Sequence, residues 1–193
     1  MPLSSLLLLL SPPHLFPSPR FFFSSPPLLP PPLPLPLLSP SLLAMSRGRI
    51  IREAPEAVRI AGSARRVAVL GIRSASYASR PAHFVPDYLA GVGVEIVPVP
   101  VGAPPETTQI LGRPVVRSLR SVAGPIDVLD VFRRPQDLHQ HLDDVIALKP
   151  RVVWLQSGIS DQAFENAVAD AGIDVVVSRC LKVDRAAYER AKL

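Results

Sequence analysis

Several arginines follow short apolar runs in this chain of 193 residues. They are Arg73, Arg80, Arg133, Arg134 and Arg179. A guanidinium group offers a planar fork of N–H donors that fits phosphate oxygens, and a helix N-terminus attracts the same ligands. The pattern predicts a site for an anionic, phosphate-bearing ligand. Arg133 and Arg134 are also compatible with a solvated pair that caps the preceding strand.

The turn after the first apolar run tests the commonest kind of nucleotide site. Gly71 stands alone there, whereas the G-x-G-x-x-G turn of dinucleotide-binding proteins has three glycines for close approach of a pyrophosphate. The next run ends at residues 98–100, Pro-Val-Pro, which offer no carboxylate to a ribose hydroxyl. An NAD site is therefore not expected. Gly71 has two interpretations, ligand contact or a tight turn.

Candidate nucleophiles and acids are few. Cys180 is the only cysteine, which excludes a disulfide framework and metal sites built from several cysteines, and it fits a small core residue. Asp130 lies inside an apolar run, where a buried carboxyl with hydrogen-bond partners is expected. Asp137 falls in a following helix and is expected to face water. We predict no catalytic residue and no metal site.

Five near-continuous runs of Val, Ile and Leu alternate with helical patterns. Such runs are typical of parallel strands buried on both faces. They predict an α/β fold, a doubly wound three-layer sandwich with a mostly parallel five-stranded sheet, whose ligands bind beyond the carboxyl ends of the strands. The expected strands cover residues 67–71, 94–99, 126–132, 151–155 and 173–177.

Amphipathic helices are expected between the strands. One begins at Pro135, the favoured first position, and another begins after Ser160 as N-cap and ends before Gly172. A third has its regular part from Pro86 onward, and a short extra helix is expected at residues 55–60.

The first 45 residues differ in composition from the rest. They hold 13 of the 24 Pro, 15 Leu and 8 Ser, no acidic residue and one charged side chain, Arg20. Proline removes a backbone donor and fixes φ, so residues 1–45 are expected to form a disordered leader before one domain, residues 46–193. The leader fits an organelle transit peptide (plastid or mitochondrion), or an extension before a true start at Met45, which implies a cytoplasmic protein.

Charge and hydropathy narrow the classes of partner. The net charge is +5 and the isoelectric point about 10.0, but no strip of interleaved aromatic and basic residues accompanies them. Nucleic acid is therefore not an expected partner. No apolar run approaches the ~18 residues of a membrane span, so a membrane is not expected either. A homodimer or an unknown partner chain stays open.

Several blocks of the sequence match one known family. The most specific are Val-Phe-Arg-Arg-Pro at residues 131–135 and Trp-Leu-Gln-Ser-Gly-Ile at residues 154–159; others lie at residues 67–72, 80–89, 95–100, 110–115 and 174–181. Over residues 55–188 the chain resembles the small single-domain CoA-binding proteins, which are Rossmann-like and similar to the CoA-binding domain of the succinyl-CoA synthetase α subunit.

The resemblance implies that CoA or an acyl-CoA lies across the strand ends, bound without catalysis by this chain. The residues implied for the phosphates are Gly71, Ile72, Arg73, Ser74, Arg80 and Pro81. The adenosine end approaches Val99 and Pro100. The pantetheine arm passes Phe132, Arg133, Arg134, Gln156, Ser157 and Gly158, with Arg179 at the same edge.

Two alternatives from the enzyme class stay open. One is a Rossmann oxidoreductase that uses NAD(P), and the other is an acyl-CoA ligase subunit that works with a partner chain. The sequence holds no counterpart of the synthetase's phosphohistidine domain, so chemistry of that kind is not expected. With CoA as ligand, Cys180 gains a second interpretation, a thiol that forms a mixed disulfide with it.

Overall fold

The computed structural model describes residues 46–192, so the predicted leader lies outside the described residues. The main sheet has six strands in the order β1-β8-β7-β6-β2-β3, all parallel to their neighbours. They are β1 (Ile50–Ile51), β2 (Arg66–Leu70), β3 (Glu95–Val99), β6 (Val128–Val131), β7 (Val152–Leu155) and β8 (Asp174–Val176). The predicted α/β fold is confirmed, with one strand more than the five expected.

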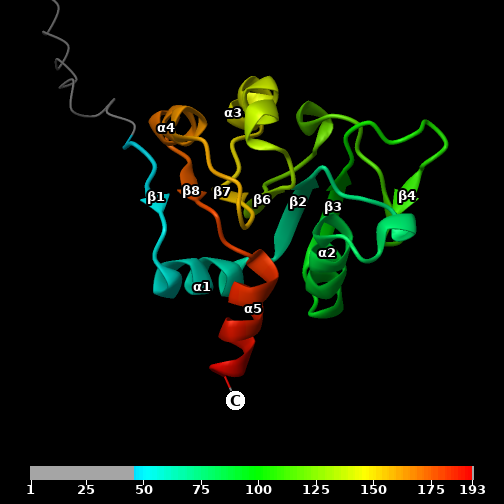
Figure 1. The fold of residues 1–193 in the computed structure, drawn as a ribbon, viewed down its shortest axis with the longest axis horizontal. Coiled ribbons are helices and arrows are strands. Elements are labelled where there is room, and N and C mark those ends of the chain that lie inside the picture. Colours follow the sequence, from blue (N-terminus) through cyan, green and yellow to red (C-terminus); the bar gives the residue numbers. More distant parts are fainter. Residues whose placement is uncertain (1–45, 193) are drawn as a thin grey trace, which may run out of the picture. The chain divides into compact units, whose positions relative to one another are not determined.

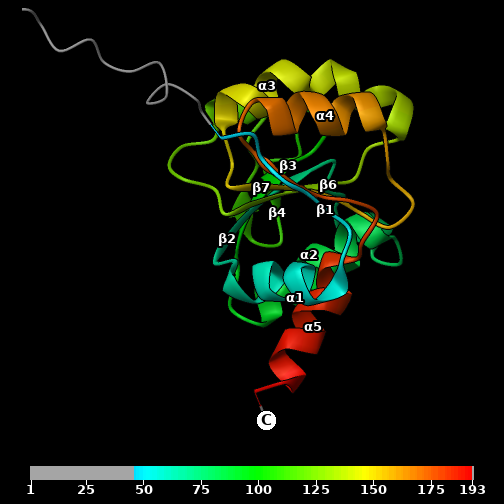
Figure 2. The same ribbon diagram turned by 90° about the vertical axis from the view of Figure 1, so that its left-hand side faces the viewer.

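Helices cover both faces of the sheet, and Figure 2 shows the three layers edge-on. On one face lie α1 (Ala54–Ser63), α2 (Pro81–Gly91) and α5 (Leu181–Arg190), and on the other lie α3 (Leu142–Leu148) and α4 (Gln162–Asp170) (Figure 1). None of the described helices is long and apolar enough to cross a membrane.

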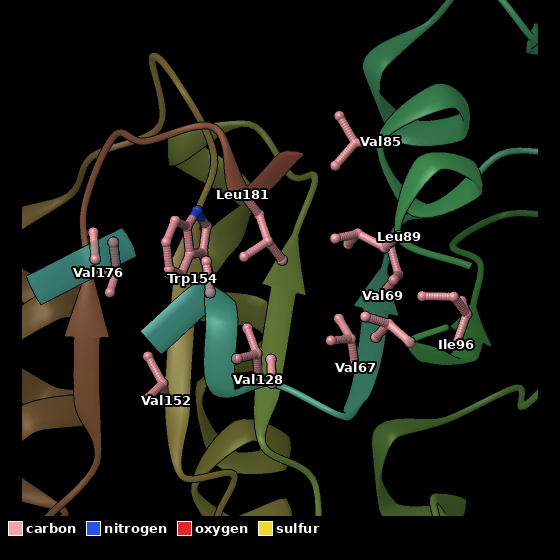
Figure 3. Packing of buried hydrophobic residues seen from close by; sticks show 14 of the residues in the cluster. Val67, Val69, Val85, Leu89, Ile96, Val128, Val152, Trp154, Val176 and Leu181 are labelled. Carbon is pink, nitrogen blue, oxygen red and sulfur yellow. The ribbon is translucent and has the colours of Figure 1, made fainter. Parts of the chain in front are cut away.

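Two apolar cores lie on the two faces of the sheet because side chains alternate along each strand. In β2, Val67 and Val69 join the core under α1, α2 and α5, whereas Ala68 and Leu70 join the core under α3 and α4. Figure 3 shows the first of these cores, with Trp154 near its centre. Trp154 is fully buried, and its indole N–H donates to the backbone oxygen of Arg179 over 2.8 Å.

Several elements differ from the sequence-based expectations. The segment from Pro135 to His141 forms a 3-10 helix, and α-helix begins only at Leu142. The side chain that caps α4 is Asp161, not Ser160, and α2 begins at Pro81 rather than at Pro86. The elements that the sequence did not indicate are β1, α5 and an antiparallel pair, β4 (Gln109–Ile110) and β5 (Arg113–Pro114).

Candidate functional site

The strand order changes direction next to β2. The chain passes from β2 to β3 on one side and then returns to place β6 on the other side of β2. In sheets of this kind a crevice opens at the carboxyl ends of the strands where the order reverses. A cavity of about 710 Å³ lies here, bounded by the segments after β2, β6 and β7 and by the first turns of α2.

This larger cavity has a mostly apolar wall with cationic groups on it. Phe84 and Val85 come from α2, Phe132 follows β6, and Ile159 follows β7. The cationic groups are Arg73, Arg80, Arg133 and Arg134. An apolar pocket with a few convergent polar groups is the usual form of a small-molecule site.

A smaller cavity of about 420 Å³ lies beside the larger one. Its wall includes Ser74 and Ser76 after β2, and residues 101–104 after β3. Arg73 and Tyr77 line both cavities, and the guanidinium carbon of Arg73 lies 5.5 Å from the centre of the Tyr77 ring. A long ligand that passes this pair can therefore occupy both cavities.

The backbone of Arg73 is tied to the start of α2. Its N–H donates to the oxygen of Ala82 over 3.0 Å, and its own oxygen lies 2.8 Å from Nδ1 of His83. The Ala82 oxygen is available because Pro86, four residues later, has no N–H to donate to it. The loop after β2 is thus held by backbone bonds, and among residues 46–192 no acidic side chain pairs with the guanidinium groups of Arg73 or Arg80.

The arginines after β6 do have an acidic partner. Arg134 bonds both carboxylate oxygens of Asp137, through Nε at 2.9 Å and Nη2 at 3.3 Å, and Arg133 reaches the same carboxylate at 3.3 Å. The hydrogen bond from Arg134 lowers the pKa of Asp137, so the carboxylate stays charged. The prediction that Asp137 faces water is wrong: the residue is buried, because its helical turn folds back onto the two arginines.

Comparison with known proteins identifies the family. The CoA binding domain family matches residues 65–186, which is well over half of the chain. The chain belongs to this family. The uncharacterized protein YneT of Bacillus subtilis (strain 168) is 30% identical over 122 residues, which cover 63% of this chain and 86% of YneT. The predicted family resemblance is therefore confirmed.

Solved structures agree with the CoA-binding fold. The structure of cell-free ID.343 from Thermus thermophilus is similar with a TM-score of 0.63 and 41% identity, over 70% of this chain and 98% of that one. A hypothetical protein from Pyrococcus horikoshii OT3 has a TM-score of 0.63 at 23% identity, over 71% of this chain and 92% of that one, and it supports the fold alone.

The structure gathers most of the residues predicted for CoA. Those on the wall of the larger cavity are Arg73, Arg80, Pro81, Phe132, Arg133, Arg134, Gln156 and Ser157. Ile72 and Ser74 lie on the wall of the smaller cavity, together with Arg73. Five predicted residues line neither cavity, namely Gly71, Val99, Pro100, Gly158 and Arg179.

Gly71 has a conformational role that the structure defines. Its φ is +87°, and a Cβ on it would lie 2.5 Å from the backbone oxygen of Phe132. Its N–H extends the sheet by donating to the oxygen of Val99 over 2.8 Å. Val99 and the following Pro100 are buried and line neither cavity, so this part of the predicted site is not exposed to a ligand there.

The segments that follow β7 and β8 are joined by a hydrogen bond. The Gly158 N–H donates to the hydroxyl of Ser178 over 3.1 Å, and both residues have positive φ. Arg179 bonds both oxygens of Asp184 at 2.8 and 2.6 Å, which raises the pKa of the guanidinium. Arg179 therefore fixes the start of α5 rather than presenting its charge to either cavity.

Asp130 and Gln156 form a buried pair next to the larger cavity. Nε2 of Gln156 lies 2.8 Å from Oδ1 of Asp130, whose Oδ2 has no partner among the described residues. Burial raises the pKa of Asp130 to about 8. Among residues 46–192, no three side chains of His, Cys, Asp or Glu lie close enough together to hold a metal ion.

Other wall residues escaped sequence reasoning. In the larger cavity they include Tyr77 and Ile159. Cys180, for which the sequence left two interpretations, is partly buried on the same wall. Arg117 acts on the smaller cavity by donating to four backbone oxygens at 2.6–3.2 Å, those of Ala103, Pro104, Pro105 and Thr107. This role of Arg117 is visible only in the folded conformation of residues 103–107, since nothing in the local sequence indicates it.

Proposed function

We propose that this protein binds CoA or an acyl-CoA across the carboxyl edge of the sheet, without catalysis of its own. The observation that carries the proposal is the pair of adjoining cavities that share Arg73 and Tyr77. One cavity is apolar and the other more polar, and two guanidinium groups, those of Arg73 and Arg80, lie at or near their junction without an acidic partner in the described part of the chain. CoA has the same order of parts: a pantetheine arm that is largely hydrocarbon apart from its amide and hydroxyl groups, charged phosphates and a polar nucleoside.

The pantetheine arm then fits the larger cavity, beside Phe132 and Gln156. The diphosphate passes Arg73, where charge-assisted hydrogen bonds are strong and directional. The nucleoside enters the smaller cavity, whose loop Arg117 holds from outside. Membership in the CoA binding domain family supports this choice of ligand over other phosphate compounds.

Calorimetric titration with a panel of nucleotides tests the proposal. We expect CoA and acetyl-CoA to bind, and NAD and NADP at equal concentration to bind at least tenfold more weakly. The single glycine after β2 and the lack of a carboxylate after β3 predict this order. Tighter binding of NAD than of CoA would show that the proposal is wrong.

A pair of variants on one helix locates the site. Ala82 lies in α2 on the wall of the larger cavity, whereas Ala90 is exposed at the other end of the same helix. We expect Ala82→Trp to fill the cavity and weaken CoA binding more than tenfold, and Ala90→Trp to change it less than twofold. Equal affinity in the two variants would place CoA elsewhere on the protein.

A further inference from the structure

A fully buried carboxyl group with an unpaired oxygen, among the described residues, lies next to the proposed site. Asp130 is fully buried in β6, between Val69 of β2 and Trp154 of β7. Its only hydrogen bond among the described residues is the one to Gln156, which is 5% exposed and lines the larger cavity. One hydrogen bond thus separates this carboxyl from the space where the pantetheine arm is proposed to lie.

Among residues 46–192, no cationic side chain forms an ion pair with Asp130. The charged groups on the surrounding elements have other partners: Arg133 bonds Asp137, Arg179 bonds Asp184, Lys182 lies over the rings of Phe84 and Tyr88, and His83 contacts the backbone oxygen of Arg73. The other titratable groups around this face are Arg73, Arg80, Arg134, Tyr77 and Cys180 on the cavity wall, exposed Asp87 on α2, and buried Arg185 on α5, which bonds Glu189 and the backbone oxygens of Ala61 and Ala64. Helix α1 contributes only alanines and Ile60 to this core.

A fully buried carboxylate with one bond and one orphan oxygen is costly, so the neutral acid is favoured. The pKa of Asp130, raised by burial to about 8, agrees with a neutral group at pH 7. The difference matters for Gln156 because a carboxylate can only accept a hydrogen bond, whereas a neutral carboxyl can also donate one.

The amide of Gln156 has two ends of the same shape. With an ionised Asp130, Nε2 must face the carboxylate, and Oε1 is then the end directed away from it. With a neutral Asp130, a half-turn of the amide lets the carboxyl O–H donate to Oε1 across the same 2.8 Å. The amide N–H groups then face the larger cavity as donors.

We propose that Asp130 is a positioning residue that turns the Gln156 amide so that it donates to a carbonyl group of the ligand. The inference rests on the proposed function, and it specifies the ligand chemistry at this point of the site. The matching groups in an acyl-CoA are the amide carbonyls of pantetheine and the thioester carbonyl. A hydrogen-bond donor at the same place in the ligand would be disfavoured while Asp130 is neutral.

The experiment measures acetyl-CoA affinity by calorimetry from pH 7 to 9.5 in four proteins. Acetyl-CoA has no free thiol to titrate, and its phosphates are already fully charged in this range, since phosphate has a second pKa of about 6. The proteins are the wild type, Asp130→Asn, Gln156→Met and the control Gln162→Met, an exposed position that opens α4. Asparagine keeps the shape and the donor of the neutral acid but cannot ionise.

We expect the affinity of the wild type and of Gln162→Met to fall about tenfold across this range, because ionisation of Asp130 removes one ligand hydrogen bond. Asp130→Asn keeps the affinity measured at pH 7 throughout, and Gln156→Met binds about tenfold more weakly with a flat profile. The Cys180 thiol lines the same cavity, but any effect of its titration persists in Asp130→Asn, so the difference between profiles belongs to Asp130.

The outcomes separate this inference from the proposed function. Parallel pH profiles for the wild type and Asp130→Asn overturn the role of Asp130 while leaving CoA binding in place. A carbon-13 NMR titration of the free protein that finds Asp130 ionised at pH 7 does the same without any ligand. Absence of acetyl-CoA binding at every pH in folded wild-type protein overturns the proposed function, and the present inference with it.

Discussion

Two groups of arginines at one edge of the sheet differ in what they are bonded to. Arg73 and Arg80, after β2, have no acidic partner among residues 46–192, whereas Arg133 and Arg134 share Asp137 and Arg179 holds Asp184. The first pair offers its full charge to a ligand, and the second group has much of its charge neutralised by the protein. Asp130 is the converse, an acid near the same edge that no arginine of residues 46–192 reaches.

The position of a charged residue at the ligand edge and the availability of its charge to a ligand are therefore separate properties. Sequence position at the end of a strand brings a guanidinium to the ligand edge. Whether its charge acts on a ligand depends on carboxylates that arrive with the next helix, such as Asp137 and Asp184. The following variants test this distinction, beginning with Asp130, which has no cationic partner among the described residues.

The largest effect is expected from Asp130→Asn on the pH dependence of stability. An acid with a pKa of about 8 when folded and near 3.8 when unfolded holds its proton more tightly in the folded state. Compared with a protein that has a neutral residue here, the free energy of unfolding of the wild type is therefore at its highest below pH 4. It falls between pH 4 and 8 and is constant above pH 8. The variant should gain about 1.4 kcal/mol over the wild type for each pH unit in that window. Urea denaturation at pH 5, 6 and 7 measures it, and an unchanging difference would mean that Asp130 is ionised.

Arg179→Ala tests the arginine with the most complete pairing. The change leaves the carboxylate of Asp184, a buried residue, without its two charge-assisted bonds, so the free energy of unfolding should fall by about 2–4 kcal/mol. CoA affinity of the folded protein should change less than twofold. Arg190→Ala, at an exposed position of the same helix, is the control. A large loss of affinity with unchanged stability would instead support the ligand contact that the sequence predicted.

The sequence was sufficient for the five longer strands of the sheet and for the edge that carries the candidate site. Long Val and Ile runs predicted the central strands because each buries both faces, and the residues after them gave most of the wall of the larger cavity. Strand β1 could not be predicted, since Ile50 and Ile51 are too short a run to show a period. Helix α5 is polar over most of its surface, with buried Leu181 at its start, and so lacks a clear apolar stripe.

The pairing of charges was the part of the site that could not be predicted. From the residue pattern alone, Arg73 and Arg179 are equal candidates for a ligand contact, because both follow an apolar run. The difference arises from Asp184, which stands five residues after Arg179 and turns back onto it when α5 begins. The conformational role of Gly71 could not be predicted either, because it depends on the position of the Phe132 backbone oxygen, which lies at the end of another strand.

Arg73→Ala tests the unpaired group. The Arg73 backbone holds the loop through its hydrogen bonds to the Ala82 oxygen and to Nδ1 of His83, so removal of the side chain should leave thermal stability nearly unchanged. Loss of a charge-assisted bond to a phosphate should weaken CoA binding by about 1.5–3 kcal/mol, roughly 10- to 100-fold. Arg59→Ala, an exposed arginine of α1 outside both cavities, is the matched control. Equal affinities in the two variants would remove the distinction between paired and unpaired arginines.

The smallest effect is expected from Asp137→Asn, and its sign is what matters. The carboxylate neutralises part of the charge of Arg133 and Arg134, so its loss should raise the affinity for CoA about threefold rather than lower it. The gain in affinity should shrink in 1 M salt, because added ions screen the charges.

The gain in affinity should also vanish at low pH. The hydrogen bond from Arg134 lowers the pKa of Asp137, so the wild type loses the carboxylate charge only below the ordinary pKa range of an aspartic acid. At such a pH the wild type resembles the variant. Calorimetry at two salt concentrations and two pH values measures each step. A loss of affinity at neutral pH would mean that Asp137 holds the two arginines in position for the ligand. The ion pairs in this segment would then favour ligand binding instead of weakening it.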